Sequence, residues 1–167
     1  VSAVDLLPTF CAIADVPVPK DRAIDGANLL PMLDGNPIER TTPLYWQYNR
    51  AHSAPKVAMR VGDWKILGHL DLPELKPGVD QTAEEMSRFK TAELTTFELY
   101  NLRRDIGETT DLAQQEPDRL AKLSATLKML YAEIREESPV WPAWEWTRYE
   151  QQHIEWPDYW VNRKRDK

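Results

Sequence analysis

The feature that most constrains the fold is a single apolar stripe along residues 117–138. Apolar side chains recur there at steps of three and four, at Leu120, Leu123, Leu127, Leu130 and Ile134. This spacing predicts an amphipathic helix with charged residues on its other faces. Pro117 suits the first helical turn, and Pro139 and Pro142 end the helix. The stripe lasts about two heptads, too short for a coiled coil, so it favours a helix packed across a sheet.

The sheet itself is predicted from three stretches rich in β-forming residues. Residues 43–48 (PLYWQY) and 96–102 (TFELYNL) are candidate strands. Between them, residues 57–67 (VAMRVGDWKIL) predict a hairpin that turns at Gly62-Asp63. The expected fold class is therefore α+β: a small antiparallel sheet of about four strands with a long C-terminal helix packed across it.

Residues 1–19 (VSAVDLLPTFCAIADVPVP) predict a helix that is apolar on nearly all sides. Ser2 and Asp5 have the spacing of a capping box, and Pro17 and Pro19 end the segment. One face of this helix carries apolar side chains at helical spacing, namely Val4, Leu7, Phe10, Cys11 and Ala14. A helix with so much apolar surface needs cover on most sides.

Residues 25–35 offer little of that cover. Asp25-Gly26 predicts a turn, and Asn28 is a good cap for a short helix over residues 29–33 that Gly35 ends. The chain starts at Val1, inside this pattern, so we expect it to be a fragment of a longer protein.

Charge and cysteine content exclude several function classes. The formal net charge of −6 argues against a nucleic-acid partner. No apolar run approaches the roughly 20 residues of a membrane span, and no signal peptide is visible, so the localisation stays open. Cys11 has no second cysteine with which to pair, and its place on an apolar face predicts a buried, unreactive thiol.

Patterns for catalysis and metal binding are missing from the sequence. His52, His69 and His153 are far apart, and neither H-x-x-x-H nor C-x-x-C spacing occurs. The glycines are isolated at predicted turns, so no phosphate-binding loop is expected. We predict no catalytic residue and no metal ligand in this chain.

Binding residues are best placed in QYNRAHS, residues 47–53, which follows the first strand. Loops at strand ends often carry binding groups, and this one gathers Asn49, Arg50 and His52. Arg50 could hold an anion with its planar fork, and His52 could donate or accept a proton. The alternative is an ordinary solvated loop between two strands.

The last residues, 138–167, hold five of the seven tryptophans and show no clean period. We expect an extended Trp-rich tail laid over the body of the protein. The alternative is an aromatic platform that stacks on sugars or on a partner.

Four stretches, in this order and spacing, resemble the C-terminal part of sulfatases of the arylsulfatase type, members of the alkaline-phosphatase-like superfamily. They are VSAVDLLPTFCAIADVPVP, DGANLLPMLDG, MRVGDWKIL and FELYNLRRDIGETTDLA. The resemblance covers about residues 1–135 and does not reach the tail. The chain departs from the family pattern at Asn28 for Ser, Asn101 for Asp, Ile106-Gly107 for a Pro-containing turn, and Asp111 for Asn.

The resemblance implies three parts of the chain. Residues 1–40 would be the last helix of an α/β catalytic domain plus a linker, which explains the apolar first helix. Residues 41–137 would be the C-terminal subdomain with its antiparallel sheet and helix, followed by the tail, 138–167. The connector between the last strand and the long helix would turn at Gly107 and return to the body at Leu112-Ala113.

For the parent protein, the resemblance implies a hydrolase of sulfate esters, either sulfated sugars or aryl sulfates, that uses a formylglycine nucleophile and calcium. The nucleophile arises in a C/S-x-P-x-R motif, which Cys11 and its successors do not match. The chain alone is therefore expected to be inactive and to hold no cofactor. Asn49, Arg50 and His52 would help wall the substrate pocket, and the parent would be exported (periplasmic or extracellular) or lysosomal.

Two other functions remain open. The chain could be a stand-alone carbohydrate-binding or protein-interaction module that uses the Trp-rich tail. It could also belong to a phosphodiesterase or phosphonate hydrolase, since these share the superfamily and similar C-terminal elements. We further expect the isolated fragment to self-associate through residues 4–16, because a second copy could cover its apolar helix.

Overall fold

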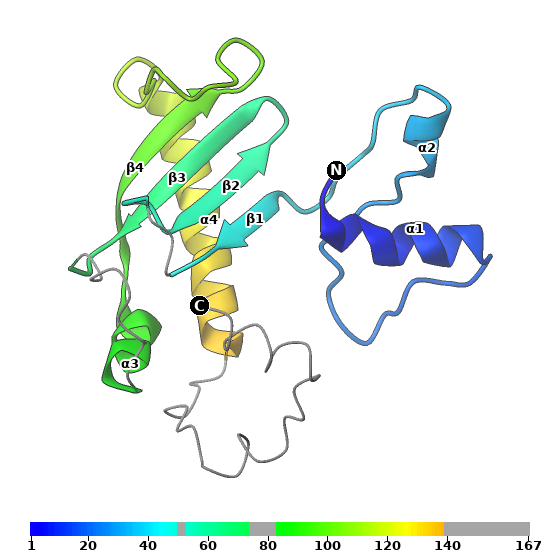
Figure 1. The fold of residues 1–167 in the computed structure, drawn as a ribbon, viewed down its shortest axis with the longest axis horizontal. Helices are drawn as coiled ribbons and strands as arrows, with labels where there is room; N and C mark the ends of the chain where they lie inside the picture. The colour runs from blue at the N-terminus through cyan, green and yellow to red at the C-terminus, as the bar shows by residue number, and fades with distance from the viewer. Residues whose placement is uncertain (50–52, 74–82, 139–167) are drawn as a thin grey trace, which may run out of the picture.

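The computed structural model describes residues 1–49, 53–73 and 83–138 (Figure 1). Its elements are the 3₁₀ helix η1 (Ala3–Asp5), α1 (Leu6–Ile13), α2 (Leu30–Leu33), β1 (Leu44–Gln47), β2 (Val57–Val61), β3 (Trp64–Leu70), α3 (Ala83–Thr91), β4 (Leu94–Asn101) and α4 (Pro117–Glu137). The four strands form one antiparallel sheet in the order β1-β2-β3-β4, and α4 runs behind it. The predicted α+β fold is confirmed.

The core lies between α4 and one face of the sheet. Its buried members are Val57, Met59, Ile66, Leu94, Leu99, Leu123, Leu127 and Tyr131. The strand registers place Met59, Ile66 and Leu99 in one row across the sheet, and all three are fully buried. Tyr131, four residues after Leu127, was not part of the predicted stripe. Its ring is buried and its hydroxyl donates to the Ala92 carbonyl at 3.0 Å.

The predicted hairpin is confirmed, with Gly62 in the left-handed region at φ 58°. The returning strand β3 is longer than predicted and ends at Leu70, and β4 begins at Leu94 rather than at residue 96. The two strands pair along this whole length, with a bulge between His69 and Leu70. Cross-strand pairing therefore extends both strands beyond what their own residue patterns indicate.

Most apolar side chains of the first helix are exposed in the described structure, as expected for an apolar helix whose cover is missing. Val4, Leu7 and Phe10 are 45%, 46% and 58% exposed, and Ala14 is exposed as well. The buried side chains of η1 and α1 are instead Asp5, Pro8, Thr9 and Cys11. This side, which carries Asp5 and Thr9, faces the linker to α2, and most apolar side chains of α1 are exposed.

Asp5 and Thr9 attach the linker to this helix. The fully buried Asp5 carboxylate accepts hydrogen bonds from the backbone N–H groups of Ser2 (2.7 Å) and Ala27 (3.0 Å). It also forms an ion pair with Arg40. The Thr9 hydroxyl donates to the Asp5 carbonyl (2.6 Å) and accepts from the Leu29 N–H (3.0 Å). The first two sequence stretches of the resemblance are thus one structural unit.

The predicted turn at Asp25-Gly26 is wrong, because the structure has neither a turn nor a bend at these residues. Gly26 serves close packing instead: a Cβ atom there would lie 1.9 Å from the Val4 carbonyl oxygen. The short helix that follows agrees with prediction apart from its first residue. The Asn28 side chain accepts from the Leu30 N–H at 3.0 Å, and Gly35 ends the helix at φ 76°.

The connector between β4 and α4 folds back along the free edge of β4. The Asp111 carboxylate accepts from the Leu99 N–H (2.9 Å), and the Leu112 N–H donates to the Leu99 carbonyl (2.8 Å). The predicted return at Leu112-Ala113 is confirmed. The chain turns at Ile106-Gly107, as predicted, and the next residue, Glu108, lies in the left-handed region (φ 53°).

No helix in the described ranges is long and apolar enough to cross a membrane.

Candidate functional site

The sheet face turned away from α4, here called the open face, carries polar and aromatic side chains. The registers align two cross-strand rows on it: Leu44, Arg60, Lys65 and Tyr100 in one, and Trp46, Ala58, Leu67 and Glu98 in the next. A third row begins at Tyr48, whose N–H donates to the Lys56 carbonyl at 3.0 Å, and includes His69 on β3. Trp46 is 44% exposed and Tyr48 is 65% exposed.

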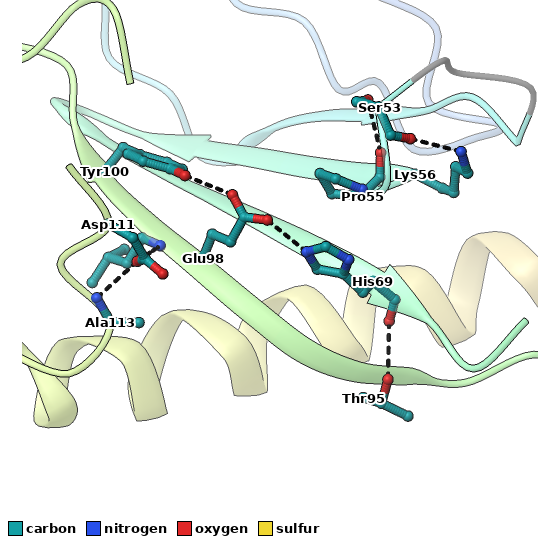
Figure 2. A network of polar contacts seen from close by, with 10 residues as sticks. Ser53, Pro55, Lys56, His69, Thr95, Glu98, Tyr100, Asp111 and Ala113 are labelled. Carbon is teal, nitrogen blue, oxygen red and sulfur yellow. Dashed lines mark hydrogen bonds and ion pairs between the residues drawn. The ribbon is translucent and has the colours of Figure 1, made fainter. Parts of the chain in front are cut away.

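Glu98 connects two neighbours on this face (Figure 2). One carboxylate oxygen lies 2.6 Å from His69 Nε2, and the other accepts a hydrogen bond from the Tyr100 hydroxyl at 2.6 Å. Burial and the hydrogen bond to Glu98 raise the pKa of Tyr100, so the phenol stays protonated. Glu98 therefore fixes the orientation of an imidazole and a phenol contributed by adjacent strands.

A cavity of about 150 Å³ lies at the end of the sheet next to His69. Its lining residues are Ala54, Lys56, His69, Leu70, Leu72, Pro73 and Phe89. Lys56 is positioned by a hydrogen bond from Nζ to the Ser53 carbonyl at 2.6 Å. Lys56 and His69 give the cavity hydrogen-bonding and cationic groups, while Phe89 and the leucines give it apolar walls. Such a cavity suits a small polar or anionic group.

Of the three predicted pocket residues, only Asn49 lies within the described residues. Its side-chain oxygen accepts from Gln47 Nε2 at 3.1 Å, and Gln47 Oε1 accepts from the Tyr45 hydroxyl at 2.8 Å. This chain of hydrogen bonds orients Asn49 where the β1–β2 connection leaves β1. Arg50 and His52 lie outside the described residues, as does the tail from residue 139, so their roles remain predictions.

Sequence reasoning missed the cluster of His69, Glu98 and Tyr100. Glu98 lies 29 positions after His69 along the chain, and only the register of β3 with β4 brings them together. One signal was available: Glu98 and Tyr100 alternate with the core residue Leu99, so they had to share the opposite face.

The described residues contain no group of three or more His, Cys, Asp or Glu side chains that could hold a metal ion. Cys11 is buried in α1, as predicted. Neither the calcium site nor the formylglycine implied by the resemblance fits the residues described, and we assign no catalytic step to them.

This chain is similar to known proteins in its fold rather than in its sequence. No protein-family model matches the chain, and no curated protein matches it. Solved structures do match. Ps i-CgsB in complex with k-i-k-neocarrahexaose is 22% identical at a TM-score of 0.57, over 91% of this chain and 28% of that one. Another structure of Ps i-CgsB is 24% identical at 0.56, over 85% and 26%.

A third match comes from Bacteroides thetaiotaomicron. The protein BT33336S-sulf, from work on the metabolism of multiple glycosaminoglycans, is 23% identical at a TM-score of 0.51, over 76% of this chain and 24% of that one. The name BT33336S-sulf marks this neighbour as a sulfatase, so the predicted likeness to sulfatases is confirmed at the level of the fold. The chain spans about a quarter of the length of the structures it matches.

Proposed function

We propose that this chain is the C-terminal part of a sulfatase that hydrolyses sulfate esters, and that its β1–β2 connection walls the substrate pocket. The supporting observation is the shared fold, which extends over 76% to 91% of this chain but only 24% to 28% of the matched structures. We propose a sulfated saccharide as the substrate class. The neighbour Ps i-CgsB was solved with an oligosaccharide, and BT33336S-sulf belongs to work on glycosaminoglycan metabolism.

Within this proposal the chain binds and orients the substrate, and the rest of the parent carries out the chemistry. Asn49, which Gln47 holds in place, would donate a hydrogen bond to a sugar hydroxyl. Arg50 would bind a sulfate oxygen with its planar guanidinium, a geometry suited to oxyanions. His52 would supply a further donor. The formylglycine and calcium of the family would belong to other parts of the parent.

The test replaces Arg50 by alanine in the complete enzyme that carries this segment. Losing a hydrogen bond to a charged group costs about 1.5–3 kcal/mol, so we expect KM to rise by about 10- to 100-fold. Because the lost contact binds substrate and transition state alike, kcat should change little. Arg104→Ala is the matched control, since Arg104 is an exposed arginine on the β4–α4 connector.

Mass spectrometry of the formylglycine peptide must show equal conversion in all three proteins. Unchanged KM and substrate preference in Arg50→Ala would refute the pocket role. A parent that cleaves phosphate diesters but not sulfate esters would refute the sulfatase assignment and favour the phosphodiesterase alternative.

A further inference from the structure

We propose that a cavity between the start of β1 and the β2–β3 hairpin turn binds a carboxylate attached to an apolar body. The site uses neither the β1–β2 connection nor a sulfate group. The inference therefore goes beyond the proposed function and is independent of it.

The cavity lies where the chain enters β1 and where β2 turns into β3. It has a volume of about 440 Å³, which is within the range of small-molecule sites. Residues 40–42 line it from the segment before β1, and residues 60–62 line it from the end of β2 and the hairpin turn. The register pairs Leu44 with Arg60, so the pairing of β1 with β2 brings these two segments together.

The charged side chains that line the cavity in the described structure are both guanidinium groups, Arg40 and Arg60. Arg40 Nη2 forms an ion pair with the buried Asp5 carboxylate, whereas Arg40 Nη1 is shielded from solvent and has no acceptor among the described residues. A buried donor without an acceptor is rare and costs stability. The Arg40 side chain is 20% exposed, so a ligand oxygen in the cavity can reach this guanidinium and supply an acceptor.

Arg60 is oriented by its own turn and keeps donors for a ligand. Its Nε donates to the Gly62 carbonyl at 2.9 Å, and its terminal nitrogens have no acceptor in the described ranges. Two acidic side chains lie nearby in the sequence. Asp63 forms an ion pair with Arg103 at 3.8 Å, and Glu39 is exposed and does not line the cavity.

One positive charge of the side chains at the cavity therefore has no partner. Arg40 is compensated by Asp5, and Lys65, the next cation in the row of Arg60, is bound to Glu108 at 2.6 Å. The guanidinium of Arg60 remains. Its single charge matches a monoanion better than a phosphate monoester, which carries about −1.5 to −2 at neutral pH.

Apolar side chains decide what the anion is attached to. They form much of the remaining wall, at Ile38, Pro43, Leu44 and Val61. Against such a wall the many hydroxyl groups of a sugar would lose hydrogen bonds to water without replacement. A hydrocarbon or aromatic body gains free energy there instead. Thr41 and Thr42 add hydroxyl donors for the oxygens of the acidic group.

A carboxylate is favoured over a sulfate ester, which is also a monoanion. It carries its charge on two oxygens instead of three, so each oxygen accepts a stronger hydrogen bond. Its two oxygens also match the fork of a guanidinium. The structure already contains this pairing, because Arg40 is bound to the carboxylate of Asp5.

The test follows the amide chemical shifts of the ¹⁵N-labelled 167-residue chain by NMR during titration with 4-phenylbutyrate. We expect a Kd of roughly 1 mM. The shifts should change at Thr41, Thr42 and Gly62, and not at Phe10, which is 58% exposed on the apolar helix α1. Three matched probes should bind more weakly: 4-phenylbutanamide lacks the charge, acetate lacks the apolar body, and 3-phenylpropyl sulfate replaces the carboxylate.

Two substitutions in the cavity wall should weaken binding of 4-phenylbutyrate. Arg60→Gln should raise Kd about tenfold, because it removes a hydrogen bond between charged groups. Val61→Ser should raise Kd about threefold, because it removes apolar surface from a side chain that is already 42% exposed. If Arg60→Gln changes the spectrum as a whole, Val61→Ser decides the question.

Three controls should leave Kd unchanged. Arg104→Gln removes an exposed arginine from the β4–α4 connector, and Met129→Ser shortens a side chain on α4 that is 64% exposed. Acetylation of the α-amino group of Val1 removes a further cation, since Val1 also lines the cavity. Loss of binding on acetylation would assign the anion to the amino group and contradict the proposal.

The carboxylate has two possible sources, which the same titration of the parent distinguishes. A residue that precedes Val1 lies about 3.8 Å from it along the chain, so an acidic side chain of the parent can enter the cavity. Binding of 4-phenylbutyrate to the parent identifies a free acid as the ligand. Absence of binding points to a carboxylate of the parent, and Arg60→Gln should then lower the urea midpoint of the parent; an unchanged midpoint would refute the site.

The proposal is also overturned if 4-phenylbutyrate does not shift the cavity amides, if the amide or the sulfate ester binds as tightly, or if Kd is unchanged in both cavity variants. None of these outcomes bears on the sulfatase proposal, because the assay measures binding without hydrolysis. Conversely, an inert Arg50→Ala variant of the parent leaves this site untouched.

Discussion

Replacing Asp5 by asparagine tests how the first helix holds its linker. The substitution keeps the shape of the side chain but removes its charge and turns one oxygen into a donor. In the native protein that carboxylate is fully buried and accepts from Ser2 N–H, Ala27 N–H and Arg40. Asparagine would leave the Arg40 guanidinium without its counter-charge and place an NH₂ group against at least one donor.

The loss of stability expected for Asp5→Asn follows from these contacts. Breaking a buried ion pair by removing one partner costs about 3–5 kcal/mol. The Arg40 side chain is 20% exposed, so water can replace part of the lost interaction. We therefore expect about 3 kcal/mol, the lower end of that range. Thr9→Val is the matched control, because it removes the hydroxyl bonded to Leu29 N–H without changing any charge. It should cost about 1 kcal/mol.

Amide hydrogen exchange at Ala27 and Leu29 is the appropriate assay, since both N–H groups are bonded to side chains of η1 and α1. A loss of about 3 kcal/mol corresponds to exchange that is faster by about a hundredfold at both amides. Thr9→Val should affect Leu29 more than Ala27. If Asp5→Asn accelerates exchange at Ala27 by less than about fivefold, the buried charge does not hold the linker and the reasoning fails.

The Asp5 carboxylate also predicts that the attachment of the linker to the first helix depends on pH. Burial alone raises the pKa of Asp5, but hydrogen bonds from Arg40, Ala27 and Ser2 outweigh it, so the pKa lies below its usual value. A group with a lowered pKa in the folded state stabilises that state above its unfolded pKa of about 3.9. This stabilisation is lost as the pH falls from that value through the folded pKa. Protection of Ala27 should decline over this acidic range in the native chain, and Asp5→Asn should lack this contribution.

Four further variants test other parts of the fold. Gly26→Ala places a Cβ atom 1.9 Å from a backbone carbonyl oxygen, so urea denaturation should show a loss of about 1–3 kcal/mol. Leu127→Ala, in the centre of the core, should cost about 2–5 kcal/mol, whereas Met129→Ala, which is 64% exposed, should leave the urea midpoint nearly unchanged. The native chain should self-associate in sedimentation at ~50 μM, and Phe10→Lys should shift it toward monomer; a monomeric native chain would contradict the prediction.

Features that depend on a few neighbouring residues could be predicted from the sequence. The hairpin turn at Gly62, the Asn28 cap, the Gly35 stop and the length of α4 all agree with the structure. Each rests on local backbone preferences or on helical spacing, and these act within a turn or two of chain. The candidate loop was proposed from local composition as well, and its binding role stays a prediction, since only Asn49 of its three residues is described.

Features that depend on distant partners could not be predicted. The sequence determined that the first helix is rich in apolar side chains, but only the tertiary structure decided which side it buries. That side is the one with Asp5 and Thr9, because these two residues bind a linker about 20 residues away. The meeting of His69, Glu98 and Tyr100 likewise depends on strand register, and a slip of one residue would move each side chain to the other face. Local patterns specify the elements of this protein, whereas the pairing of strands far apart in the chain decides which polar side chains come together on the sheet.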